Sequence, residues 1–154
     1  MSLKIYTDGS CRGNGQVNST GAWGYVVLDE QEEIITTGSG FKDNTTNQRM
    51  ELMAAAQGLY YISEHSKYKD AKVEVYTDSA YLHNCVTQKW YVKWRINGWK
   101  NSKKEPVANR DLWELLINYF DNKNITFHKV DAHKDNKWNN YVDNMVQTLS
   151  AKVG

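Results

Sequence analysis

Two short segments of the sequence share a pattern that could do chemistry. Residues 5–10 (IYTDGS) and 75–80 (VYTDSA) are each an apolar stretch that ends in an aspartate followed by small residues. If the two segments are parallel neighbouring strands, Asp8 and Asp78 leave the sheet at the same edge, where α/β sheets place their ligands. Two carboxylates held close together repel unless one is protonated or a cation lies between them. Oxygen ligands without a histidine or cysteine set favour Mg²⁺ or Mn²⁺. The alternative for each aspartate is a turn former or helix cap.

Three further residues are weaker candidates when each is taken alone. Glu51 interrupts residues 49–55 (RMELMAA), which are otherwise suited to burial, and Asp143 lies in residues 141–145 (YVDNM), early in a predicted helix. The alternative for both acids is a favourable interaction with the positive end of a helix dipole. His133 lies in a predicted polar loop, where a histidine is more often a solvated side chain than a catalyst.

Residues 89–104 contain six cations and no acid, in a chain whose formal net charge is +1. The rest of the chain therefore carries −5, and a basic block on an acidic body predicts an anionic partner that docks at one place. Trp90, Tyr91, Trp94 and Trp99 interleave with these cations. Cations of this kind contact phosphates, and indoles pack on sugars or bases. The alternative is that the indoles pack inside the protein between short helices.

The elements that must position these residues follow from the apolar periodicity. Alternating or β-branched stretches predict strands, and apolar residues at helical spacing predict helices. The predicted strands are residues 3–7, 22–28, 33–37, 73–77 and 125–129, with a polar hairpin turn at 29–32. The order β-β-β-α-β-α-α-β-α predicts a mixed sheet covered by helices, with right-handed crossovers between its parallel strands.

Four helices are predicted, and three of them have a clear apolar face. The first follows the N-cap cluster Thr45-Thr46-Asn47, and the second spans residues 79–97 and is stopped by Gly98. The third begins at Asn109 or Asp111, and the fourth follows a polar loop at 131–137. The residues expected to face inward are Leu52, Ala55, Ala56, Leu59 and Ile62 in the first helix, Leu112, Leu115, Leu116 and Tyr119 in the third, and Trp138, Val142, Met145 and Leu149 in the last.

Length and composition predict one ordinary globular domain over residues 1–154. No apolar run is long enough to span a bilayer. The strand pattern begins at Leu3, which predicts that no signal peptide precedes it. Cys11 and Cys85 have no metal-ligand spacing, so we expect free thiols in a reducing cytoplasm. With no apolar stripe left over, a monomer is expected.

Four segments in order resemble type-1 ribonuclease H of the prokaryotic kind over the whole chain. They are residues 6–10 (YTDGS), 46–52 (TNQRMEL), 76–79 (YTDS), and the His133 and Asp143 pair. The resemblance implies an α/β ribonuclease H-like fold whose five-stranded mixed sheet has the order 3-2-1-4-5. It also implies an endoribonuclease that cuts the RNA strand of RNA–DNA hybrids and leaves 5′-phosphate and 3′-hydroxyl ends.

The same resemblance implies a catalytic site with two Mg²⁺ ions, for which Mn²⁺ can substitute. The implied ligands are Asp8, which bridges both ions, with Glu51 and Asp78 on one ion and Asp143 on the other. His133 would assist protonation or product release.

The resemblance further implies how an RNA–DNA hybrid is held. Asn14, Thr46 and Arg49 match positions that hold a DNA phosphate. Residues that match the minor-groove surface, where RNA 2′-hydroxyls are read, are Cys11, Asn14, Asn47, Gln48 and Ser79. The basic segment resembles a handle that grips the DNA strand through Lys89, Trp90, Lys93, Trp94, Arg95, Trp99 and Lys100. Gln48 replaces a more usual asparagine, and Ile96 and Asn97 fall where some relatives are basic.

Two other functions compete with this interpretation. A DNA-acting nuclease of the same fold, such as a resolvase or integrase core, would share the clustered carboxylates but not residues 46–52 or the handle. A non-catalytic module that binds hybrid or RNA would be favoured by the loss of an acidic residue, yet all four acids are present.

Overall fold

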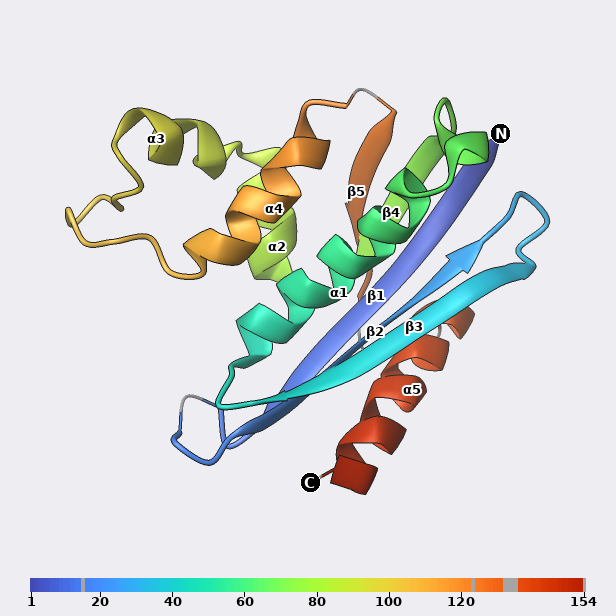
Figure 1. Ribbon diagram of the computed structural model, residues 1–154, viewed down its shortest axis with the longest axis horizontal. Coiled ribbons are helices and arrows are strands. Elements are labelled where there is room, and N and C mark those ends of the chain that lie inside the picture. The colour runs from blue at the N-terminus through green and yellow to red at the C-terminus, as the bar shows by residue number, and fades with distance from the viewer. Residues whose placement is uncertain (15, 123, 132–135, 154) are drawn as a thin grey trace.

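The computed structural model describes residues 1–14, 16–122, 124–131 and 136–153, and it contains one five-stranded sheet (Figure 1). The strand order is β3-β2-β1-β4-β5, which confirms the predicted order. β1 pairs antiparallel with β2 and parallel with β4, and β4 pairs parallel with β5. The strands are β1 (Ser2–Arg12), β2 (Thr20–Leu28), β3 (Ile34–Asp43), β4 (Lys72–Thr77) and β5 (Ile125–Lys129). β3 continues well past Thr37, where the prediction ended, because it pairs with β2 as far as Thr20.

The helices lie on both faces of this sheet. They are α1 (Asn47–Ser63), the short 3-10 helix η1 (Ser66–Tyr68), α2 (Ala80–Thr87), α3 (Trp90–Ile96), α4 (Arg110–Phe120) and α5 (Lys137–Val153). α1 lies against β1 and β2 and contacts α4, whereas α5 crosses β1, β2 and β3 (Figure 1). In the described part of the chain, no helix is both long and apolar enough to cross a membrane.

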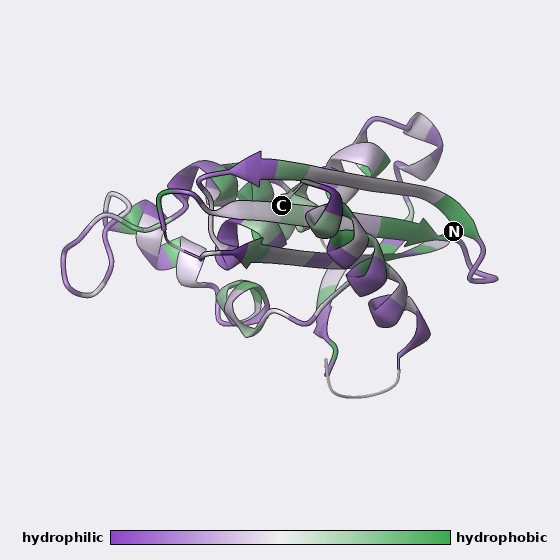
Figure 2. Ribbon diagram, turned by 90° about the horizontal axis from the view of Figure 1, so that it is seen from below, coloured by the Kyte–Doolittle hydropathy of each residue, from purple (hydrophilic) through white to green (hydrophobic). Residues whose placement is uncertain are grey.

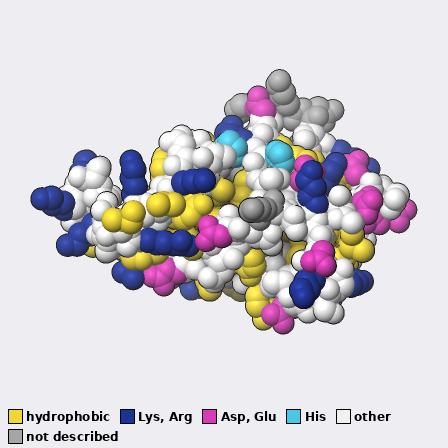
Figure 3. Space-filling model, turned by 90° about the horizontal axis from the view of Figure 1, so that it is seen from above, with side chains coloured by type: hydrophobic (Ala, Val, Ile, Leu, Met, Phe, Trp, Pro, Cys, Tyr) yellow, Lys and Arg dark blue, Asp and Glu magenta, His cyan; other side chains and the backbone are white. Residues whose placement is uncertain are grey.

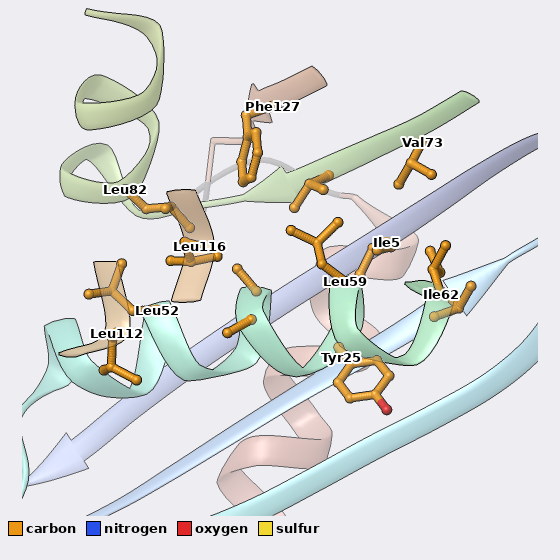
Figure 4. Packing of buried hydrophobic residues seen from close by; sticks show 14 of the residues in the cluster. Ile5, Tyr25, Leu52, Leu59, Ile62, Val73, Leu82, Leu112, Leu116 and Phe127 are labelled. Carbon is orange, nitrogen blue, oxygen red and sulfur yellow. The ribbon is translucent and has the colours of Figure 1, made fainter. Parts of the chain in front are cut away.

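Two cores result from the alternation of side chains along the strands. Ile5 and Val27 point to the larger core under α1 and α4, which also holds Leu59 and Leu116 (Figure 4). Their strand neighbours point the other way, into a smaller core against α5 that contains Tyr6, Val26, Leu28, Trp138 and Val142. The expected burial of Trp138 and Val142 is therefore confirmed, and Met145 packs on this core partly buried.

The single helix predicted over residues 79–97 is wrong, because the chain forms two helices there. α2 ends at Thr87, and Lys89 adopts a left-handed conformation (φ 55°) before α3 begins. Cys85 and Tyr91 are both buried, and six positions apart they would lie on different sides of one straight helix. The break lets both side chains reach the interior. Among the described residues, three helices therefore lie between β4 and β5 instead of the predicted two. The predicted stop is confirmed, since Asn97 ends α3 and Gly98 has a φ of +68°.

The inward face of α4 also differs in part from the prediction. Leu112 and Leu116 are buried as expected, but Leu115 is 54% exposed and Trp113 is fully buried. The buried stripe is Leu112, Trp113, Leu116 and Ile117, so α4 is rotated toward its tryptophan. The indole Nε1–H of Trp113 donates a hydrogen bond to the Tyr81 hydroxyl (2.9 Å), which satisfies the polar atom of this buried side chain.

Candidate active site

The two aspartate-containing segments lie side by side in register. In the parallel pairing of β1 and β4, Ile5 is opposite Val75 and Tyr6 is opposite Tyr76. Asp8 and Asp78 each follow two residues after the last of these pairs, so they leave the sheet at the same edge. The hydroxyl of Thr7 donates to the Tyr76 carbonyl (3.2 Å) and ties the two strands together just before the aspartates. The expected parallel neighbours are confirmed.

Helix α1 reaches this edge because residue 9 has no side chain. A Cβ atom on Gly9 would lie 2.5 Å from the backbone nitrogen of Glu51, closer than real Cβ contacts allow. α1 therefore lies directly on β1 and brings Glu51 beside the strand that carries Asp8.

Neither α1 nor α5 has an acidic residue in its first turn, so the helix-dipole alternative for Glu51 and Asp143 is wrong.

Asp8 is the most strongly perturbed of the four acids. It is only 6% exposed, and its Oδ2 has no hydrogen-bond partner among the described residues. Burial first, and then the charges of Asp78 and Asp143, raise its pKa to about 8. The contact between Asp8 and Asp143 joins two carboxyl groups, so it is a hydrogen bond only when one of them is protonated. Otherwise the repulsion must be relieved by a cation.

Glu51 and Asp78 share this environment in part, whereas the Asp143 side chain is exposed. Burial raises the pKa of Glu51, and a hydrogen bond with Ser79 partly opposes that rise. Burial also raises the pKa of Asp78, with a further increase from the charge of Asp143 and a decrease from Lys129 at the end of β5. All four acids carry carboxylates, and hard oxygen donors of this kind suit a divalent cation such as Mg²⁺.

These carboxylates do not form a closed cage. Within the ranges that the structure describes, no three Asp, Glu, His or Cys side chains lie close enough to enclose one metal ion. Such open sites are usual for Mg²⁺, which keeps several waters and binds one or two carboxylates together with substrate phosphates. A cation held here would complete its coordination with water and substrate. His133 falls outside the described residues.

The polar residues expected to contact substrate gather where the end of β1 meets the start of α1. The side chain of Thr46 caps α1 by accepting from the Arg49 backbone N–H (3.2 Å), which confirms the predicted N-cap cluster. The Asn47 Oδ1 accepts from the Cys11 N–H (2.6 Å), and the Asn14 Oδ1 accepts from the Asn47 N–H (2.8 Å). Gln48 is exposed on the first turn of α1.

These contacts fix the orientation of both amide groups. A backbone N–H can only donate, so the atom facing it must be the side-chain oxygen of Asn14 or Asn47. The oxygens are thus used within the protein, and the two NH₂ groups are what these side chains can offer to a ligand. Ser79 is different, because it is buried, accepts from the Leu82 N–H (3.1 Å) and hydrogen-bonds to Glu51.

The basic segment projects at one end of the molecule as α3 and a hydrophilic loop (Figure 2). Its indoles pack on one another and on the core: ring centroids lie 6.5 Å apart for Trp90 and Trp94, 6.0 Å for Trp94 and Trp99, and 5.6 Å for Trp94 and Trp113. All three tryptophans of the segment are partly buried against the larger core. Part of each indole ring is therefore packed inside the protein, as the alternative interpretation expected, and the rest of the ring stays exposed.

The cations of this segment surround the remaining exposed apolar surface (Figure 3). A hollow of about 460 Å³ is lined by Trp90 and Trp94 together with Lys93, Asn97 and Lys100. Lys89, Lys93 and Lys100 are exposed. Arg95 is partly engaged within the protein, since it lies 3.9 Å from Asp121 and 5.5 Å from the centre of the Tyr91 ring.

A family model decides the class of this protein. The model of RNase H matches residues 1–150. The chain belongs to the ribonuclease H family. A protein of Clostridium botulinum named "Ribonuclease H" is 42% identical over 143 residues, which cover 92% of this chain and 90% of that protein. Members of the ribonuclease H family are hydrolases that cleave the RNA strand of RNA–DNA hybrids, and this chain is an enzyme of that class.

Solved structures confirm the ribonuclease H fold. The chain is 24% identical to LC9-RNase H1, described as a type 1 RNase H with the type 2 active-site motif, with a TM-score of 0.79 over 97% of this chain and 72% of that one. LC11-RNase H1, solved in complex with an RNA/DNA hybrid, has a TM-score of 0.69 at 21% identity over 97% of this chain and 99% of that one. The expected resemblance to ribonuclease H is confirmed by the family model and by the named relative.

Two residues beside the ribonuclease H site, Asn109 and Asp111, were predicted only as possible starts of a helix. Asn109 precedes α4 with a φ of 63° and makes no capping hydrogen bond. Its side chain instead accepts from Arg49 Nη1 (3.3 Å) and donates to the Tyr81 hydroxyl (3.3 Å). Asp111 forms an ion pair with Arg49 (2.7 Å). The sequence carries no signal for either contact, because Asn and Asp before a helical pattern predict a cap with equal force.

Proposed function

We propose that this chain hydrolyses the RNA strand of an RNA–DNA hybrid with two divalent ions, Mg²⁺ by preference, and leaves 5′-phosphate and 3′-hydroxyl ends. The observation that carries the proposal is the buried Asp8 carboxylate, which has an unpartnered oxygen and two acidic neighbours. Asp8 would serve both ions, with Glu51 and Asp78 on one and Asp143 on the other. When bound, the ions would stabilise the charge on the reacting phosphate and lower the pKa of a bound water.

The protein's own groups would align the hybrid and manage protons. His133 would assist protonation of the leaving group or product release. Asn14, Thr46 and Arg49 would hold a DNA phosphate, and the minor-groove contacts would come from Cys11, Asn14, Asn47 and Gln48. Ser79 would act chiefly by holding Glu51, since its hydroxyl already has two partners in the protein. The handle would grip the DNA strand through its exposed lysines and the open parts of Trp90, Trp94 and Trp99.

The first test is a comparison of substrates and metals. The purified protein is incubated with end-labelled RNA–DNA hybrid, RNA duplex, DNA duplex and single-stranded RNA, each with Mg²⁺, Mn²⁺ or EDTA. We expect metal-dependent cutting of RNA in the hybrid alone. Tight binding of hybrid without cutting would favour a binding module, and cutting of DNA would favour the resolvase-like alternative.

Replacing Asn47 with aspartate tests the free amide. The variant keeps an oxygen for the Cys11 N–H but exchanges the outward NH₂ for a charged acceptor, so it loses a donor and repels phosphate. We expect KM for hybrid to rise about tenfold, because a lost hydrogen bond that leaves a group unpaired costs ~1–3 kcal/mol. Steady-state kinetics measure the change.

The matched control is Asn118→Asp, which makes the same charge change at an exposed position of α4. It should keep the wild-type KM, and both variants should unfold at nearly the wild-type temperature. Equal KM values for the two variants would contradict a substrate contact at Asn47.

Replacing Lys89, Lys93 and Lys100 together with alanine tests the handle. Arg95 is kept because its contacts with Asp121 and Tyr91 give it a structural role as well. We expect KM to rise with kcat little changed, since the lysines act in binding. The plot of log(kcat/KM) against log salt should flatten by about one unit for each lysine that contacts a phosphate.

The control for this variant removes three exposed lysines elsewhere, Lys69, Lys72 and Lys152. It equals the handle variant in net charge and should keep both the KM and the salt slope closer to wild type. If the two triple variants behave alike, only the overall charge matters and the handle is not the grip.

We also propose a monomer in the cytoplasm. Both cysteines of the chain are free thiols, Cys11 half-buried and Cys85 buried, as suits a reducing compartment. Gel filtration of the purified protein tests the monomer directly.

A further inference from the structure

The Arg49 side chain is held on one side by residues at the start of α4. Its Nη2 donates to Asp111 Oδ2 (2.7 Å) and its Nη1 donates to Asp111 Oδ1 (3.0 Å), so the ion pair is bidentate. Nη1 also donates to Asn109 Oδ1 (3.3 Å). A planar guanidinium held by three hydrogen bonds has a fixed plane and a fixed direction.

This arrangement uses only one of the two forks that a guanidinium offers. Asp111 and Asn109 occupy the end formed by the two Nη atoms. The second fork, formed by Nε–H and the remaining Nη2 hydrogen, donates to no group in the part of the chain that the structure describes. That fork has the spacing of two phosphate oxygens, and Arg49 keeps about a quarter of its side chain exposed.

Of the two residues that hold Arg49, Asn109 is itself anchored beside the handle. Asn109 donates to the Tyr81 hydroxyl, which also accepts from the Trp113 indole N–H (2.9 Å). Trp113 in turn packs against Trp94 of the handle, with ring centroids 5.6 Å apart. The start of α4 is therefore the point at which the handle and Arg49 are fixed relative to each other.

We propose that Asp111 is a positioning residue, which holds one fork of Arg49 so that the other fork is presented to a phosphate of the substrate. The inference rests on the proposed role of Arg49 in binding the hybrid. Asp111 would act before binding: a free arginine must give up rotamer freedom when it contacts a phosphate, whereas a clamped one has already done so. The carboxylate itself would not touch the hybrid.

We expect the pair to contribute less to folding than to substrate binding, and this difference separates the proposed role from a structural one. The Asp111 side chain is 66% exposed, and ion pairs at such sites add little to stability. Loss of Asp111 should therefore change substrate binding much more than it changes the unfolding temperature.

The experiment measures KM and kcat on RNA–DNA hybrid for Asp111→Ala, Arg49→Ala and the double variant, with thermal unfolding of each. We expect Asp111→Ala to raise KM about two- to tenfold, the range for ordering one long side chain on binding, with kcat within about twofold and the unfolding temperature little changed. Because Asp111 would act only through Arg49, the double variant should have the same KM as Arg49→Ala alone.

The matched control is Glu114→Ala, which removes the other arginine–carboxylate pair of α4, that of Arg110 and Glu114. Its KM should stay at the wild-type value. An unchanged KM for Asp111→Ala, or effects of the two single variants that simply add, would overturn the inference. A lower KM would also overturn it and would show that the carboxylate competes with phosphate for Arg49. If Arg49→Ala itself binds hybrid normally, the inference falls together with the proposed role of Arg49, although cleavage of hybrid by the wild-type chain still stands.

Discussion

Asp8→Asn is expected to lower turnover on RNA–DNA hybrid by about 1000-fold or more. The substitution keeps the size of the side chain and removes the carboxylate that lies within reach of both Asp78 and Asp143. Loss of a ligand shared by two ions would withdraw several kcal/mol of charge stabilisation from the transition state, and each ~1.4 kcal/mol is worth a factor of ten in rate. Single-turnover cleavage of a labelled hybrid measures the effect.

The protein should still fold and still bind its substrate. The contacts made by the handle and by the start of α1 do not involve Asp8, so fluorescence anisotropy should give a hybrid affinity within a few-fold of wild type. The matched control is Asp70→Asn, an exposed aspartate before β4, which should cleave normally. Cleavage by Asp8→Asn at the wild-type rate would refute the assignment of the carboxylate site.

The metal-free protein should lose stability as the pH rises from about 4 to about 8. Folding raises the pKa of Asp8 to about 8 from its ordinary 3.8, so between these values the folded state holds a proton that the unfolded state has released. Stability therefore falls with rising pH across this window. The expected loss is on the order of 3 kcal/mol, since each unit of pKa shift corresponds to ~1.4 kcal/mol and partial hydration of the site reduces the total.

The comparison with Asp8→Asn isolates this effect from every other titrating group. Denaturant unfolding in EDTA at pH 5 and at pH 8 should show the variant close to wild type at the lower pH and more stable at the higher one. Mg²⁺ should raise the unfolding temperature of the wild type more than that of the variant, because a ligand that binds only the folded state stabilises it. A wild-type protein whose stability in EDTA rises from pH 5 to pH 8 relative to the variant would contradict the proposed state of Asp8.

The edge of the sheet that carries Asp8 and Asp78 was predictable because each aspartate directly follows its own predicted strand in the sequence. Ile5 and Val75 begin equivalent stretches, and once their strands pair in parallel, the two aspartates must emerge together. The place of Glu51 beside them depends on Gly9, whose missing side chain lets α1 approach the strand. The sequence shows that glycine, but its consequence is visible only when the helix is in place.

The parts that could not be predicted depend on contacts between distant segments. Periodicity alone favours one helix over residues 79–97, and the break at Lys89 arises from the need to bury both Cys85 and Tyr91. Likewise, Leu115 and Trp113 are both large and mainly apolar, and the packing of α4 against α1 and the handle selects the tryptophan. The contacts of Arg49 with Asn109 and Asp111 span about sixty positions in the chain, so no spacing rule could have revealed them.

The cluster of indoles at the handle has an optical consequence. Four of the six tryptophans belong to it: the ring centroids of Trp90, Trp99 and Trp113 each lie 5.6–6.5 Å from that of Trp94. At such separations the electronic transitions of neighbouring rings couple, so we expect this small region to contribute strongly to the near-ultraviolet circular dichroism of the protein. A change in this spectrum on mixing with a hybrid would follow the handle itself, without any label attached.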